Sequence, residues 1–160
     1  MSVDMFIKIG DIEGESTDSS HGKEIDVLAW SWGMSQSGTT HMGGGGGAGK
    51  VSVQDISITK YVDASSTVLM KACCQGVHHP EAKLTVRKAG TDPLEYIKLT
   101  MKEVIITSVS TGGSGGEDRL TENVTLNFAE FKLEYTPQKP DGTGDATKEY
   151  AFNIAENIPA

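Results

Sequence analysis

The stretch IDVLAWSWGM, residues 25–34, indicates the fold class of this chain. Large and small side chains alternate along it, which is the period of a β-strand, because successive side chains of a strand point to opposite faces. From Leu28 onward the even positions carry leucine, tryptophan, tryptophan and methionine, and the odd positions carry alanine, serine and glycine. We therefore expect a strand whose large side chains enter a core and whose small side chains lie on a flat outer surface.

The same alternation recurs along most of the chain and predicts further strands. These strands lie at about 3–9, 51–60, 82–89, 97–105, 124–135 and 150–154. Within 51–60 and 124–135 the apolar residues change from one parity to the other. A phase change of this kind predicts a bulge in the first segment. In the second it predicts a long strand that bends round a corner and serves two sheets.

One segment departs from this period. Residues 64–75 carry apolar side chains at helical spacing, with Asp63 or Ser65 as the N-cap and Gly76 at the position of a C-terminal glycine. One short helix among many strands predicts an all-β dominated fold, a β-barrel or sandwich with a helix on its side. We expect one domain over 1–160, with an extended loop at 35–50 and a loose loop at 136–147.

Composition excludes several classes of protein. The net charge is −8 with no basic cluster, which argues against nucleic-acid binding. No apolar run is long enough to span a membrane, and the N-terminus lacks the pattern of a secretory signal peptide, so synthesis into the cytoplasm is expected. The only cysteines, Cys73 and Cys74, are adjacent and rarely bridge, which fits reduced thiols.

Ten of the 19 glycines lie in two short stretches, 43–49 and 112–116. Gly44 to Lys50 has the spacing of a phosphate-binding loop, but that motif needs serine or threonine next and then a helix, whereas Val51 begins a predicted strand. The second run places Ser114 in a G-x-S-x-G pattern, although the strand–turn–helix scaffold of a hydrolase is missing. We expect no nucleotide cofactor, and keep a hydrolase using Ser114 only as a competing hypothesis.

Two other groups of polar residues suggest chemistry. Cys73 and Cys74 point about 100° apart on a helix and do not converge on one metal with His78 or His79, so no metal is expected. Glu122, close to an acidic stretch, is expected to be solvated at the start of a strand. No catalytic constellation emerges, and the sequence favours a structural or binding protein over an enzyme.

The loop at 35–50 exceeds the usual length of a loop in a compact domain, and such loops are commonly functional. We expect it to become ordered against a neighbouring subunit. The small side of the strand at Ala29, Ser31 and Gly33 suits a close contact or the wall of a channel.

Several segments resemble those of the Hcp family, the inner-tube proteins of bacterial type VI secretion systems. They are VDMFIKIGD at 3–11, EIDVLAWSWG at 24–33, GAGK at 47–50, KLTVRKAG at 83–90, and SVSTGGSGGED at 108–118 followed by TENVTL at 121–126. The resemblance follows the chain in order over nearly its whole length. The segment at 108–118 is its most specific part.

The resemblance implies a β-barrel of two antiparallel sheets with one short helix, assembling as a hexameric ring with a wide channel. Rings stack into a tube that a contractile sheath expels behind a spike, and effector proteins travel in the channel. It implies that the extended loop reaches the adjacent ring, with candidate contacts at Gln36, Thr39, His41, Met42, Gly47, Gly49 and Lys50. It also implies a protein that is cytoplasmic before firing and secreted without a signal peptide. The alternative function is a monomeric β-barrel that carries a small ligand in a closed apolar cavity.

Overall fold

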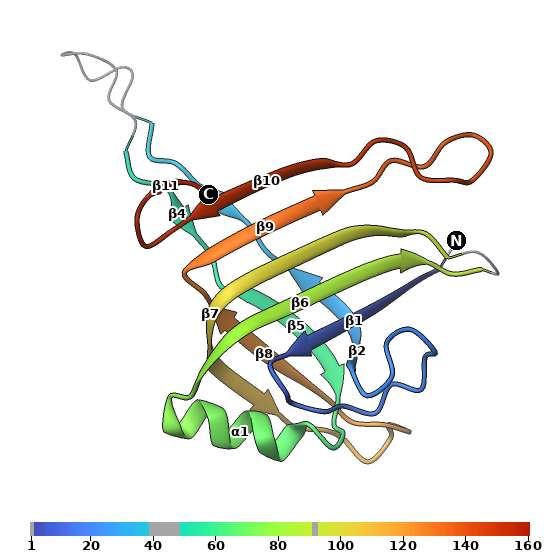
Figure 1. Cartoon of the computed structure of the whole chain (residues 1–160). Helices are drawn as coiled ribbons and strands as arrows, with labels where there is room; N and C mark the ends of the chain where they lie inside the picture. Colours follow the sequence, from blue (N-terminus) through green and yellow to red (C-terminus); the bar gives the residue numbers. More distant parts are fainter. Residues whose placement is uncertain (1, 39–48, 91–92) are drawn as a thin grey trace.

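The structure, a computed structural model, describes residues 2–38, 49–90 and 93–160 (Figure 1). The described elements are β1 (Val3–Ile9), β2 (Ile25–Ser31), β3 (Met34–Ser35), β4 (Ser52–Val53), β5 (Ile56–Tyr61), α1 (Ser66–Gln75), β6 (His78–Lys88), β7 (Glu95–Thr111), β8 (Thr121–Asn127), β9 (Glu130–Tyr135), β10 (Lys148–Asn153) and β11 (Ile158–Pro159). Strands dominate and a single helix accompanies them in the described ranges, so the predicted fold class is confirmed.

Six antiparallel strands close into a barrel. Their order is β7-β6-β1-β2-β5-β8, and β8 pairs back onto β7. The 17-residue strand β7 makes this closure possible, because its first part pairs with β6 and its last part with β8. The partner changes near Ile105, and a register shift follows within the β7–β8 pairing, between Ile106 and Ser108. On the far side of β7, the strands β9, β10 and β11 extend the sheet beyond the barrel (Figure 1).

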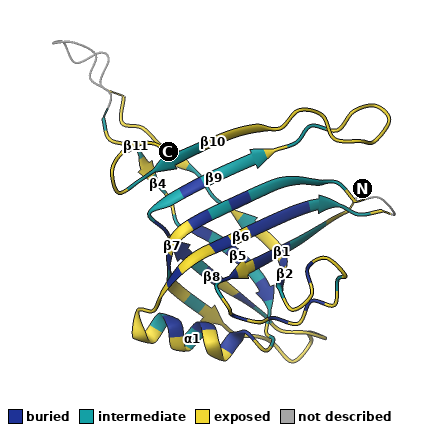
Figure 2. Cartoon of the chain, viewed as in Figure 1, coloured by how far each residue is buried: buried dark blue, intermediate teal, exposed yellow. Residues whose placement is uncertain are grey.

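Alternating side chains fill the barrel interior, as the two-residue period predicted. Fully buried aliphatic residues from facing strands form one cluster, which includes Ile7, Ile9, Ile25, Ile56, Ile58, Leu84, Leu99, Val124 and Leu126. Figure 2 shows the matching stripes, in which buried and exposed positions alternate along the strands. A barrel of this size is filled by side chains rather than by a cavity, so the packing of these side chains stabilises it.

The expected continuous strand over 25–34 is wrong in two respects. It ends at Ser31, and the short strand β3 follows after a break. In addition, a register shift lies between Val27 and Ala29, which places Leu28 at a bulge and leaves it 39% exposed. The bulge reverses the inward parity, so that Ile25 and Val27 are buried before it while Trp30 packs on the core after it. Leu28 is therefore not the core residue that the alternation predicted.

The phase changes within 51–60 and 124–135 have a cause other than the predicted bulge and bend. Residues 51–60 form two strands, β4 and β5, that are separated at 54–55 and lie in different sheets. Residues 124–135 likewise form β8 and β9, which break at 128–129. The phase changes therefore mark strand ends rather than a bulge and a bend. The long strand that pairs with one strand along its first part and with another along its last part is β7.

Helix α1 begins two residues later than expected, at Ser66, and ends at Gln75 as predicted. Gly76 adopts φ 61°, ψ 38°, the left-handed conformation that favours glycine after a helix, and this prediction is confirmed. Ser65 is the N-cap residue, but its side chain makes no capping bond. Instead it donates to Asp63, 2.5 Å away. Residues 136–147, predicted as a loose loop, connect β9 to β10 and contain a bridge between Gln138 and Gly144.

A buried ionic cluster joins α1 to two strands of the barrel. The Nζ of Lys60 on β5 donates to Oε2 of Glu122 on β8 at 2.6 Å and lies 3.0 Å from Oδ1 of Asp63. Ser66, in the first turn of α1, donates its hydroxyl to the same Glu122 oxygen at 2.8 Å. Lys60 and Glu122 are 0% and 1% exposed, so the expectation that Glu122 is solvated is wrong.

We expect Lys60→Met to lower the free energy of unfolding by about 3–5 kcal/mol, because it leaves two carboxylates buried without their cation. Adding Glu122→Leu should recover part of this loss. The matched control is Lys132→Met, which breaks the half-exposed pair of Lys132 with Glu149 and should cost less than about 1 kcal/mol. Urea unfolding at one fixed protein concentration measures the free energy of unfolding of all three variants. Equal costs for the two lysine variants would contradict this role of the cluster.

Candidate functional site

One outer face of the barrel is built of small polar side chains. Two rows cross the strands β2, β5, β8 and the last part of β7. The register places Ser31, Ser57, Thr125 and Ser108 side by side in the first row, and Ala29, Thr59, Asn123 and Ser110 in the second. We call these eight residues the small-residue wall. They alternate with buried residues such as Ile58 and Val124, whose side chains point into the core.

Hydrogen bonds link the side chains of the wall across the strands. Thr59 donates to Asn123 at 2.7 Å, and the hydroxyls of Ser108 and Thr125 lie 2.6 Å apart. Next to the wall, Asp55 accepts bonds from the Thr107 hydroxyl and the Asn127 amide, each at 2.8 Å. Four of the eight side chains are thus held in two bonded pairs, and the wall carries no large apolar or charged side chain.

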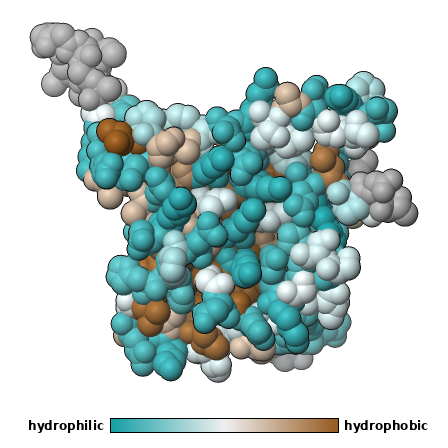
Figure 3. Space-filling model, in the orientation of Figure 1, coloured by the Kyte–Doolittle hydropathy of each residue, from teal (hydrophilic) through white to brown (hydrophobic). Residues whose placement is uncertain are grey.

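The face formed by β1, β6, the first part of β7, β9 and β10 has the opposite character. Its outward positions carry Lys8, Lys83, Arg87, Lys98, Lys102, Glu130, Lys132, Glu134 and Glu149. Ion pairs connect neighbouring strands on this face, such as Lys102 with Glu130 at 3.6 Å and Lys132 with Glu149 at 3.5 Å. Figure 3 shows the side on which these strands lie in Figure 1, covered largely by hydrophilic side chains. Such a surface is typical of contact with water.

The structure brings two of the three predicted channel residues into the small-residue wall. Ala29 and Ser31 are exposed there, whereas Gly33 is half-buried between β2 and β3, beside the Gln54 side chain. Sequence reasoning missed the wall's other residues. The signal that could have found them is the alternation of serine, threonine and asparagine with isoleucine, valine and leucine in β5 and β8.

The extended loop is anchored to the barrel by a short stem. The strands β3 and β4 pair Met34 with Val53, and Trp32 donates its indole N–H to the carbonyl of Gln54 at 3.0 Å. An apolar groove of about 120 Å³ separates the stem from β9 and β10, and it is lined by Met34, Val51, Val53, Phe131, Tyr150 and Phe152. The stem is therefore fixed on one side of the molecule, next to the strands that extend the sheet.

The predicted stacking residues divide into two groups. Gln36 and Lys50 are exposed, and Gly49 lies so close to Ser37 that an added Cβ would stand 2.2 Å from its hydroxyl oxygen. Thr39, His41, Met42 and Gly47 lie outside the described residues.

The other motifs lie at the loop stem, in the connection from β7 to β8 and on α1. Lys50 is followed by the strand β4, not by the helix that a phosphate-binding loop requires. Ser114 is exposed in the connection from β7 to β8. Both cysteines are free. Within 2–38, 49–90 and 93–160, no three His, Cys, Asp or Glu side chains form a group that could hold a metal ion. No helix in the described part of the chain has the length and apolar character needed to cross a membrane.

Comparison with known proteins accounts for this combination of a closed barrel, one helix and a long loop. A family model described as "Type VI secretion system effector, Hcp" matches residues 6–135. The chain belongs to the Hcp family. Protein hcp1 of Pseudomonas aeruginosa is similar throughout, with 65% identity over 162 residues that cover 100% of both chains.

Solved structures of the Hcp family share the fold. A structure of a type six secretion system protein superposes with a TM-score of 0.93 at 28% identity, over 99% of this chain and 100% of that chain. Hcp1 from Salmonella typhimurium has a TM-score of 0.80 at 34% identity, with 100% of both chains covered. The resemblance inferred from the sequence is confirmed, and this Hcp chain is a structural protein of a type VI secretion system.

Proposed function

We propose that this chain is a non-enzymatic tube subunit: six copies close into a ring, rings stack, and effector proteins ride in the channel. The observation that carries the proposal is the contrast between the two outer faces of the barrel. A wall of short, uncharged side chains, four of them bonded in pairs, suits a channel through which different proteins pass, because it offers neither apolar patches nor fixed charges that would hold them. The charged face, with its paired lysines and glutamates, suits the outside of the ring.

The strand pairing supports lateral association. On one side, β2 pairs with β5 up to Ser31, but on the other side β1 pairs only with Ile25 and Asp26. The edge of β2 from Leu28 to Ser31 therefore has no strand partner among the described elements. Exposed edges are templates for pairing with another chain. A closed ring would cover this edge and the half-exposed Leu28 in every copy.

The remaining parts of the proposal follow from the family. We infer contacts with the sheath and the spike of the same secretion system, and a protein that is cytoplasmic before firing and leaves the cell without a signal peptide. The stem formed by β3 and β4 supports ring stacking, because its paired residues Met34 and Val53 give the extended loop a fixed base. A monomeric small-ligand carrier is the less favoured function, since tightly packed aliphatic side chains occupy the barrel interior.

The first prediction concerns the assembly itself. Light scattering should give a particle of about six times the chain mass of 17.0 kDa. Leu28→Glu should shift the particle to monomers, because it places a charge at the seam. The control, Lys132→Glu on the charged face, should leave the ring intact. A wild-type protein that is monomeric at every concentration would overturn the proposal.

The second prediction concerns which face lines the channel. In a background with Cys73→Ser and Cys74→Ser, a small maleimide should label both Ser57→Cys and Lys132→Cys. A maleimide carried by a large globular protein should label six sites per ring at Lys132→Cys. At Ser57→Cys it should label about one, because the first label fills the channel. Equal labelling by the large reagent in intact rings would place the wall outside the channel.

The third prediction separates ring stacking from ring closure. Deletion of residues 39–49 should leave rings of unchanged mass but prevent their stacking, as seen by electron microscopy under conditions in which the full chain forms tubes. If the deletion also abolished the rings, the assignment of this loop to the contact between rings would be wrong.

A further inference from the structure

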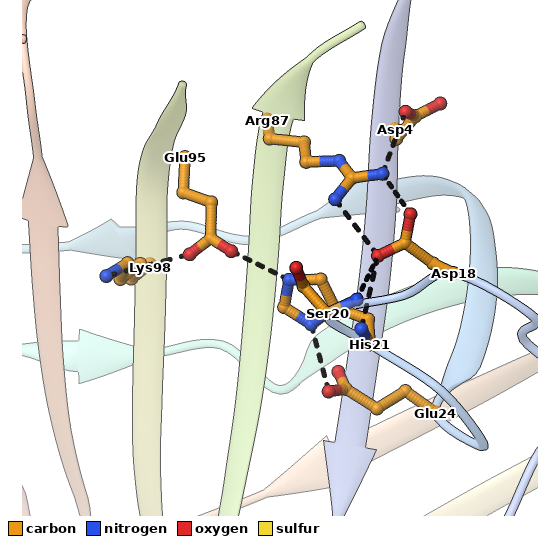
Figure 4. Close-up of polar contacts among 8 residues, drawn as sticks. All are labelled: Asp4, Asp18, Ser20, His21, Glu24, Arg87, Glu95 and Lys98. Atoms are coloured by element: carbon orange, nitrogen blue, oxygen red, sulfur yellow. Dashed lines mark hydrogen bonds and ion pairs between the residues drawn. The ribbon is translucent and has the colours of Figure 1, made fainter. Parts of the chain in front are cut away.

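A second polar cluster, unrelated to the small-residue wall, pins the connection between β1 and β2 to the charged face (Figure 4). The imidazole of His21 lies between two carboxylates. Its Nδ1 is 2.9 Å from Oε2 of Glu24, and its Nε2 is 2.8 Å from Oε1 of Glu95 on β7. The ring also stacks on Phe6 of β1, with centroids 4.6 Å apart and planes at 9°.

This geometry selects one protonation state. An ionised carboxylate only accepts hydrogen bonds, so both ring nitrogens must donate, and only the imidazolium form has two donors. Burial alone would lower the pKa of His21, but the hydrogen bonds to Glu95 and Glu24 outweigh it and raise the pKa above its usual value of 6.5. Neutral His21 would lose one of the two bonds and leave a carboxylate oxygen without its donor.

A second anchor, two to three residues away, holds the same segment. Asp18 accepts bonds from the guanidinium of Arg87 on β6 and from the backbone N–H groups of Ser20 and His21. The bond to Arg87 holds the pKa of Asp18 below its usual 3.8. This anchor is therefore present above that value and is lost only in acid, so it stays formed over the pH range in which His21 titrates.

The charges around His21 come from every packed element. Its own segment supplies Asp18 and Glu24, β1 supplies Asp4 and Lys8, β6 supplies Glu81, Lys83 and Arg87, and β7 supplies Glu95 and Lys98. A surface hollow of about 440 Å³, lined by His21, Glu24, Glu95, Lys8 and Lys83 among others, adjoins the ring. Solvent in this hollow gives protons access to the cluster. By contrast, the base of the connection is fixed by backbone bonds, such as Gly14 to Lys23 at 2.7 Å.

We propose that His21 is a proton-operated latch that holds residues 17–22 against the charged face at acidic to neutral pH and loosens them as the pH rises. The direction of this pH dependence follows from the linkage between protonation and stability. A raised pKa in the folded protein means that the stabilisation is complete below 6.5 and disappears as the pH passes through the higher, folded value. The Hcp family is secreted, so the latch tightens when the protein meets a more acidic compartment. It acts within one chain and does not depend on ring formation.

Hydrogen exchange read by mass spectrometry tests the latch on the full-length protein. Exchange at the C2 carbon of each histidine should give a midpoint for His21 above 6.5. Protection of the 17–22 amides, corrected for intrinsic exchange, should fall across that midpoint. Each pH unit by which the measured midpoint exceeds the usual value corresponds to about a tenfold loss of protection.

Three variants complete the test. Glu95→Gln should lower the His21 midpoint and move the loss of protection to lower pH by the same amount. His21→Gln should abolish the pH dependence, whereas His78→Gln, at an exposed histidine, should leave it unchanged. The proposal is overturned if wild-type protection at 17–22 stays constant between pH 6 and 9, or if His21→Gln retains the wild-type pH dependence.

Discussion

β7 hydrogen-bonds to β6 along its first part and to β8 along its last part, and this double pairing closes the sheet into a barrel. Closure forces the strands to curl, so each strand has one side in a shared core and one side on the outer surface. Because β7 also pairs with β9, the same strand carries the extension that flanks the loop stem. The positions of the small-residue wall, the charged face and the stem all depend on β7.

Closure creates two outer faces that point in different directions. The side chains on these two faces can then differ in size and charge without changing the packing of the core. On the wall, short side chains bond to one another and expose no charge. On the charged face, lysines and glutamates pair across strands, and the latch cluster of His21 and Arg87 lies beside them. Self-association of an acidic chain requires contacts at its seams that outweigh the repulsion between copies with a net charge of −8. The unpaired edge of β2 offers hydrogen bonds and an apolar side chain for this purpose.

Helical spacing and a following glycine predicted the single helix and Gly76, and the two-residue period predicted most strands, because these features depend on local side-chain pattern. It failed where the partner strand decides the outcome. The bulge at Leu28 arises from the register of β2 against β5. The break at 54–55 arises where the chain passes from one sheet to the other, and the break at 128–129 arises between β8 and β9, which both pair with β7. The site was predicted in part for the same reason: Ala29 and Ser31 were visible along one strand, whereas the full rows appear only when four strands are aligned. Glu122 looked like a surface residue because its partner, Lys60, is 62 positions away.

The proposed function requires the small-residue wall to face the lumen of a ring. Electron cryomicroscopy of the purified, assembled protein at a resolution that separates strands tests it directly. We expect a six-fold ring in which β2, β5, β8 and the end of β7 line the channel, with the charged face directed outward. A ring whose channel is lined by the lysines and glutamates of β6, β7, β9 and β10 would contradict it.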